Sequence, residues 1–112
     1  GGKDRTLSIA PAQYIRQVLL KFKKLKLNDF EVSLEVTHHG PSINVPVMFV
    51  EVGSSEKQWN NLEVCKKVAD VIIEVLTEDI EKVTTVLGFG GNHYGAKFSR
   101  KAGLNLNKLA NL

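Results

Sequence analysis

The sequence predicts a three-layer α/β fold, in which helices flank a mixed β-sheet. Side chains from Phe30 to Val36 alternate between apolar and polar, as in a strand with one buried and one wet face. The run from Val47 to Val52 is almost continuously apolar, as in a central strand covered on both faces. Two longer segments show the apolar spacing of amphipathic helices. The predicted order of elements is β, α, β, β, α, β.

The first helix is predicted from Pro11 to Leu25, because Pro is favoured at the first helical position and apolar residues follow at helical spacing. Its apolar stripe consists of Ile15, Val18, Leu19, Phe22 and Leu25. The second helix is predicted from Asn61 to Leu76, after Ser54 and Ser55 as candidate caps. Its stripe consists of Val64, Val68, Val71, Ile72 and Val75.

The four predicted strands cover residues 7–10, 30–36, 47–52 and 83–89. The strands ending at Val52 and Phe89 are joined through a helix, so they are expected to be parallel with a right-handed crossover. The link from Thr37 to Val47 is short for a parallel crossover, which favours antiparallel strands on either side. An antiparallel pair would place the turn after Val36 at the opposite sheet end from Gly53 and Gly90.

Composition predicts one small cytosolic domain, covering residues 1–112. The single Cys cannot form an internal disulfide, and no apolar stretch approaches the length of a membrane span. The net charge of +3 conceals a partition: residues 1–28 carry a balance of +6, residues 29–81 one of −8, and residues 82–112 one of +5. The basic flanks could attract phosphate or could be ordinary solvated faces.

All three histidines follow predicted strands, where functional loops concentrate. His38 and His39 precede Gly40-Pro41, and His93 lies in a Gly-rich segment. Imidazole exchanges protons near neutral pH, so these residues are candidate catalytic groups. The alternative is structural: one His closes the turn through a backbone hydrogen bond and the other is solvated. A metal site from His38, His93 and Glu51 is also conceivable, although the ligand spacing matches no recognisable zinc pattern.

The segment from Gly53 to Trp59 follows the predicted central strand. Its backbone amides could bind phosphate or an oxyanion, while Ser54 and Ser55 could simply cap the helix. Trp59 could stack on a base or serve packing. The Gly-rich segment from Gly88 to Gly95 matches neither the phosphate loop that ends in Lys-Ser/Thr nor the glycine spacing of dinucleotide-binding folds. No nucleotide cofactor is therefore expected. It offers accessible backbone, with His93, Tyr94 and Lys97 as polar side chains.

Three motifs together carry a family resemblance. They are Leu34-Glu35-Val36-Thr37-His38-His39-Gly40-Pro41, then Phe49 to Trp59 (FVEVGSSEKQW), then Gly88 to Ser99 (GFGGNHYGAKFS). In this order and spacing the chain closely resembles the archaeal and plant type of D-aminoacyl-tRNA deacylase, over about Leu7 to Ser99.

The resemblance implies a fold similar to peptidyl-tRNA hydrolases and nucleoside phosphorylases, and hydrolysis of the ester between a D-amino acid and tRNA. Family members are longer, so the chain corresponds to their central part, and residues 100–112 form a tail without resemblance. The implied partner is the tRNA acceptor end, and the implied cofactor is zinc.

The resemblance also suggests roles for individual residues. His38 or His39 would be the base, His93 would orient the substrate or assist the leaving group, and amides near Gly53 or Gly90 would bind the oxyanion. The predicted substrate-binding residues are Thr37, Gly53, Ser54, Ser55, Glu56, Trp59, Gly90, Gly91, Tyr94 and Lys97. Arg16, Lys21, Lys23, Lys24, Lys97, Arg100 and Lys101 could attract tRNA phosphates. Two alternatives stay open: a non-catalytic RNA-binding fragment and a nucleoside-phosphorylase-like enzyme.

Overall fold

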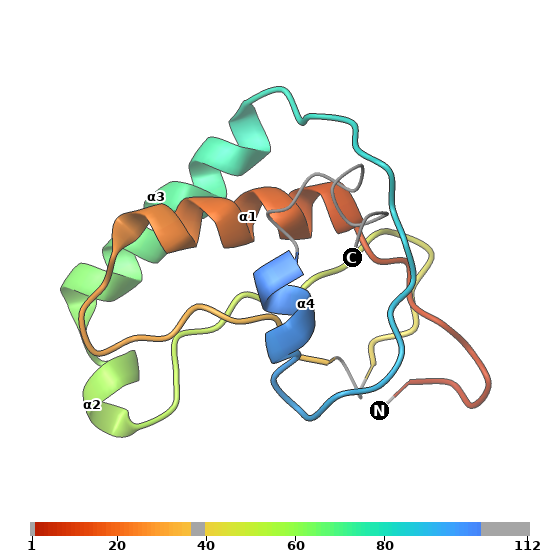
Figure 1. The fold of residues 1–112 in the computed structure, drawn as a ribbon, viewed down its shortest axis with the longest axis horizontal. Helices are drawn as coiled ribbons and strands as arrows, with labels where there is room; N and C mark the ends of the chain where they lie inside the picture. The colour runs from red at the N-terminus through yellow and green to blue at the C-terminus, as the bar shows by residue number, and fades with distance from the viewer. Residues whose placement is uncertain (1, 37–39, 102–112) are drawn as a thin grey trace.

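A computed structural model describes residues 2–36 and 40–101 of the chain. Four helices occur in this part: α1 (Ala12–Leu25), α2 (Glu56–Trp59), α3 (Leu62–Thr77) and α4 (Ala96–Lys101). Figure 1 shows α1 and α3 side by side, with α4 below α1 and the short α2 near the start of α3. Irregular chain connects these helices. No helix within the described ranges is both long and apolar enough to cross a membrane.

The core lies between α1 and α3. Val18 of α1 packs with Val71 and Val75 of α3, and Val75 is 0% exposed. These residues belong to the apolar stripes that the sequence predicts, which recur every three or four positions and so line one face of each helix. Burial of those two faces holds the helices together. Both long helices are therefore confirmed, with ends within one residue of the predicted ones.

A polar cluster closes the edge of the α1–α3 contact. Lys21 Nζ lies 2.6 Å from Glu74 Oε1 and 3.1 Å from Glu78 Oε2. Gln17 donates to Glu78 over 2.9 Å, and this bond is the main reason why the pKa of Glu78 is lowered, followed by the bond from Lys21. The hydrogen bond to Glu74 raises the pKa of Lys21 in turn. Arg16 pairs with Glu81 over 3.0 Å, so α1 is tied to the chain that follows α3.

The predicted three-layer mixed sheet is wrong. No strand is present among the described residues, and the segments 7–10, 30–36, 47–52 and 83–89 run as irregular chain. One isolated antiparallel bridge joins Glu35 to Tyr94. The backbone amide of Val47 also donates to the carbonyl of Ile9 over 2.9 Å. These contacts bring segments together locally without building a ladder of paired strands.

The burial of side chains explains why the strand patterns misled. Between residues 30 and 36 the apolar Phe30, Val32 and Leu34 are partly covered, but so is Ser33, and Val36 is 46% exposed, so burial follows the alternation only in part. The run from Val47 to Val52 is not covered on both faces, because Phe49 is 50% exposed. In the segment 83–89, Phe89 is 89% exposed. Alternation specifies which side chains face inward, but a sheet also needs a neighbouring backbone to pair with.

Two short helices lie outside the predicted ones. Helix α2 follows Ser55, and Gln58 Oε1 accepts from the amides of Ser54 and Ser55 at 3.0 and 3.1 Å. Helix α4 begins just after the Gly-rich segment and includes two residues of the predicted tail, Arg100 and Lys101. Asn61, and not a serine, caps α3, because its side chain accepts from the amide of Val64 over 3.2 Å. Pro11 precedes α1 as its N-cap.

Candidate functional site

Two segments that are far apart in the sequence meet at the bridge between Glu35 and Tyr94. The amide of Val36 donates to the carbonyl of His93 over 2.9 Å, and the amide of Gly95 donates to the carbonyl of Leu34 over 2.8 Å. The bridge between them is antiparallel. The polypeptide just before Thr37 is thereby held beside His93. We call residues 34–36 together with residues 93–95 the bridge segment pair.

The side chains of this pair form a carboxylate–imidazole contact. His93 Nε2 lies 2.9 Å from Glu35 Oε1, and both side chains are about half exposed. The Tyr94 ring stands edge-on to the His93 ring, with 5.0 Å between their centroids. An imidazole held by a carboxylate is oriented and can transfer protons, whereas an isolated one samples several rotamers. This contact is the best-defined chemical feature near the predicted histidines.

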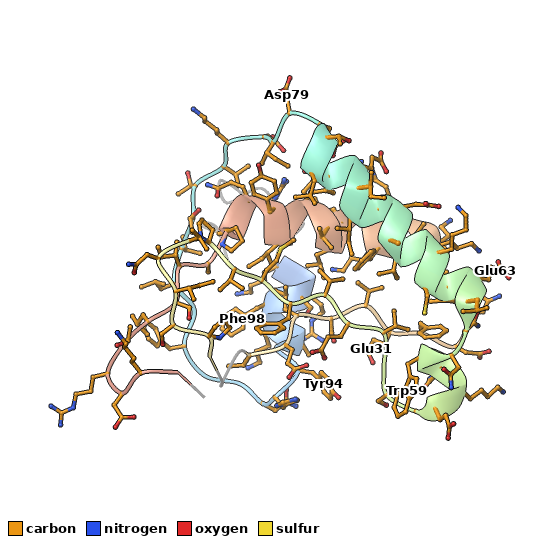
Figure 2. All side chains as sticks on the ribbon, turned by 180° about the vertical axis from the view of Figure 1, so that it is seen from behind. Glu31, Trp59, Glu63, Asp79, Tyr94 and Phe98 are labelled. Carbon is orange, nitrogen blue, oxygen red and sulfur yellow. The ribbon has the colours of Figure 1, made fainter. Side chains whose placement is uncertain are left out.

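A buried hydroxyl on α4 supports the bridge segment pair from behind. Ser99 is only 6% exposed, and its Oγ accepts from the amide of Leu34 over 2.7 Å and donates to the carbonyl of Gly95 over 3.0 Å. Lys23 of α1 donates to the Ser99 carbonyl. Figure 2 shows Tyr94 and Phe98 together at α4. One side chain therefore links both bridged segments to the same helix.

A groove of about 1540 Å³ runs beside this pair, between the inner face of α1 and the irregular segments 30–35 and 47–54. Glu35 and Tyr94 line it, and so do Gly53, Ser54 and Trp59 from the region around α2. Its volume exceeds the 300–1,000 Å³ or so that small-molecule sites usually occupy.

The structure thus brings together part of the predicted site. Four predicted substrate-binding residues line the groove: Gly53, Ser54, Trp59 and Tyr94. Five others in the described ranges, namely Ser55, Glu56, Gly90, Gly91 and Lys97, are exposed and lie outside its lining. Thr37, His38 and His39 fall outside the described residues.

Two of the predicted amide sites differ in character. The amides of Ser54 and Ser55 already donate to Gln58 Oε1, so they do not point at open space. Gly90 and Gly91 have φ angles of 92° and 101°, which favour glycine, and an added Cβ at either would meet no atom within 4 Å. Glycine is needed there for backbone conformation, and the space around it is open.

The predicted zinc site does not assemble from the described residues. Zinc needs three or four ligands in close convergence. Within residues 2–36 and 40–101, no three His, Cys, Asp or Glu side chains come together as a metal-binding group. Glu51 lines the groove, and His93 contacts Glu35, but these residues form no such group. The third predicted ligand, His38, lies outside the described ranges.

Sequence reasoning missed Glu35 and Ser99. The strand pattern assigns Glu35 only to a wet acidic face, since alternation does not show which residue lies opposite. Its position two residues before Thr37, in the first motif, was the available signal. Ser99 stands in a segment with no recognised periodicity, so its burial depends on the unpredicted helix α4.

Comparison with known proteins identifies relatives along nearly the whole chain. The family model for D-aminoacyl-tRNA deacylase matches residues 1–108. A D-aminoacyl-tRNA deacylase of Cenarchaeum symbiosum is 40% identical over 102 residues, which are 88% of this chain and 40% of that protein. The proteins of the same name from Thermococcus onnurineus and Saccharolobus solfataricus are each 40% identical over 91% of this chain, and 38% and 44% of their own lengths are covered. The chain spans about two fifths of the length of these relatives. Since the family model covers almost every residue, the chain belongs to the D-aminoacyl-tRNA deacylase family.

Proposed function

We propose that this chain carries part of the active site of a hydrolase that releases D-amino acids from tRNA. The observation that carries the proposal is the Glu35–His93 contact, in which Glu35 lines the groove and His93 lies outside its lining, in a chain of this family. The contact supplies an imidazole oriented by Glu35, a residue of the groove lining, and the volume of the groove supports binding of a bulky substrate such as the acceptor end of a charged tRNA.

The reaction is attack of water on the ester carbonyl that joins the amino acid to ribose. A bond forms between the water oxygen and the carbonyl carbon, the ester C–O bond breaks, and a proton passes to the departing ribose hydroxyl. In the proposed mechanism His38 or His39 takes the proton from water, and His93 gives a proton to the leaving group. His38 and His39 follow Val36 by two and three positions in the sequence, which supports a shared site with His93.

The groove residues suggest how the substrate is held. Trp59 is 52% exposed on α2 and lines the groove, so its ring is available to stack on the terminal base (Figure 2). Tyr94 is also 52% exposed and lies against His93, where a phenol can hydrogen-bond the ester or the amino group. Rejection of L-amino acids would be steric, by the backbone that surrounds the ester.

Zinc enters the proposal from the family resemblance alone. The described residues hold no group of three ligands, so a zinc site at His93 or Glu51 would need His38 or another donor from outside the described ranges. A deacylation assay with and without a chelator tests the requirement. We place the activity in the cytoplasm, where tRNA is charged.

The test is single-turnover release of D-tyrosine from D-tyrosyl-tRNA by the chain and by His93→Ala. Loss of a positioned proton-transfer group typically slows a reaction by about 10²–10⁴-fold, and we expect a loss in that range. L-tyrosyl-tRNA is the matched control substrate, and circular dichroism checks that the variant keeps its helices. Wild-type rates in His93→Ala would contradict the role of His93. Binding of tRNA by the wild-type chain without any deacylation would instead support the non-catalytic RNA-binding alternative.

A further inference from the structure

We infer that Glu35 is a positioning residue that sets the orientation and the proton-bearing nitrogen of His93. This inference rests on the proposed function, because it assigns Glu35 a role only through a catalytic His93. The carboxylate Oε1 lies 2.9 Å from His93 Nε2, within the range of a charge-assisted hydrogen bond. A carboxylate that accepts from Nε2 favours the neutral tautomer with the proton on Nε2. The free lone pair of the imidazole is then on Nδ1.

The backbone around this contact removes the freedom that a surface ion pair normally has. Two hydrogen bonds, from Val36 to His93 and from Gly95 to Leu34, fix the chain on both sides of Glu35. The Ser99 hydroxyl holds Leu34 and Gly95 from α4. The two facing residues therefore start from Cα positions that are already set, and only side-chain torsions remain to be fixed by the contact.

The contact has little to contribute to folding. Both side chains are about half exposed, at 51% for His93 and 40% for Glu35, and exposed pairs of this kind stabilise proteins very little. Edge-on packing of Tyr94 already covers one part of the imidazole ring. A carboxylate that stands opposite His93 without a large structural benefit is explained by its effect on the orientation of the imidazole.

Three variants test the inference: Glu35→Ala, Glu35→Gln and the control Glu63→Ala. Glu63 is likewise an exposed carboxylate in an ion pair, with Lys67 at 2.7 Å, but it lies on α3. We expect Glu35→Ala to lower kcat for deacylation by about 10–100-fold while KM and the melting temperature change little, as for residues that orient a catalytic group. Glu35→Gln keeps an acceptor oxygen for Nε2, so we expect it to recover at least part of the rate. Glu63→Ala should leave kcat and KM unchanged.

The outcomes separate this inference from the proposed function. If His93→Ala abolishes the activity and Glu35→Ala keeps the wild-type kcat, Glu35 is not a positioning residue, although the role of His93 stands. If His93→Ala is fully active, His93 is not a proton-transfer group of the reaction, and the proposed function loses the observation on which it rests. The double variant Glu35→Ala/His93→Ala should be no slower than His93→Ala alone, because Glu35 acts only through the imidazole. A further decrease of the rate in the double variant would overturn the inference.

Discussion

Ser99 combines burial with a full set of hydrogen bonds. Its Oγ accepts from the Leu34 amide and donates to the Gly95 carbonyl, at 2.7 and 3.0 Å, and the residue is 6% exposed. The bond to Leu34 is partly buried, so loss of its acceptor would leave the Leu34 amide incompletely solvated. The Ser99 hydroxyl therefore adds two hydrogen bonds to the two backbone hydrogen bonds that hold the bridge segment pair.

We predict that Ser99→Ala lowers the free energy of unfolding by about 1–3 kcal/mol, because the Leu34 amide is left without its acceptor. Chemical denaturation of the variant and the wild type measures the difference. Thr77→Ala is the matched control: Thr77 Oγ1 also donates to the carbonyl four residues earlier, Ile73, over 2.9 Å, but the residue is exposed. The control should change stability by less than about 0.5 kcal/mol. Equal effects of the two substitutions would show that the hydrogen bond between Ser99 and Leu34 adds nothing to the free energy of unfolding.

At the level of single residues, the sequence indicates chemistry better than geometry. His93 and Tyr94 are recognisable as candidate site residues because imidazole and phenol are reactive types in a Gly-rich segment. Glu35 is not recognisable as their partner, because its contact with His93 joins positions far apart in the sequence. Such contacts depend on how the chain folds back, which alternation along one segment does not encode.

At the level of elements, the long helices are predictable because their signal is local. Each apolar stripe lies within one segment, and the partner stripe has the same character, so α1 and α3 pack whichever other elements form. The absence of a sheet from the described residues is not predictable, because a strand needs a neighbour that the sequence pattern does not name. Helix α4 is short and follows glycines, so no periodic pattern in the sequence marks it.

The polar cluster between α1 and α3 predicts how stability depends on pH. The pKa of Glu78 is lowered from its ordinary value of 4.5, so its contribution is present above that pH and is lost as the pH falls through the lowered value. The pKa of Lys21 is raised from 10.5, so the contribution of Lys21 to stability is present below that pH and is lost as the pH rises further.

We expect the melting temperature to fall on acidification below about pH 4.5, as followed by circular dichroism. Glu78→Gln removes the titrating carboxylate, so its melting temperature should fall less on acidification from neutral pH. An equal fall in both proteins would assign the acid sensitivity to other groups.

At the level of the whole molecule, the three-part charge partition is changed by folding. The acidic middle of the chain neutralises part of the basic N-terminal flank, because Arg16 pairs with Glu81 and Lys21 with Glu74 and Glu78. Lys23 is engaged by the Ser99 carbonyl. In the described part of the chain, four exposed cations of the predicted set are bound neither by a carboxylate nor by a backbone carbonyl there: Lys24, Lys97, Arg100 and Lys101. Folding therefore narrows the predicted phosphate-binding set to these cations, most of which lie on α4.

The last prediction follows from this narrowing. If α4 contacts tRNA phosphates, Lys97→Ala/Arg100→Ala should weaken tRNA binding and reduce the slope of log K against log salt by about one for each phosphate contact that is removed. Lys66→Ala/Lys67→Ala is the matched control, since it removes the same net charge from α3, where both lysines pair with carboxylates at 2.6 and 2.7 Å. Binding curves at several salt concentrations measure both slopes.

Equal losses of affinity in the two double variants would mean that net charge alone attracts the tRNA. A loss confined to the α4 variant locates the phosphate contacts on the helix whose Ser99 also holds the bridge segment pair, so that tRNA docking and the orientation of His93 share one element.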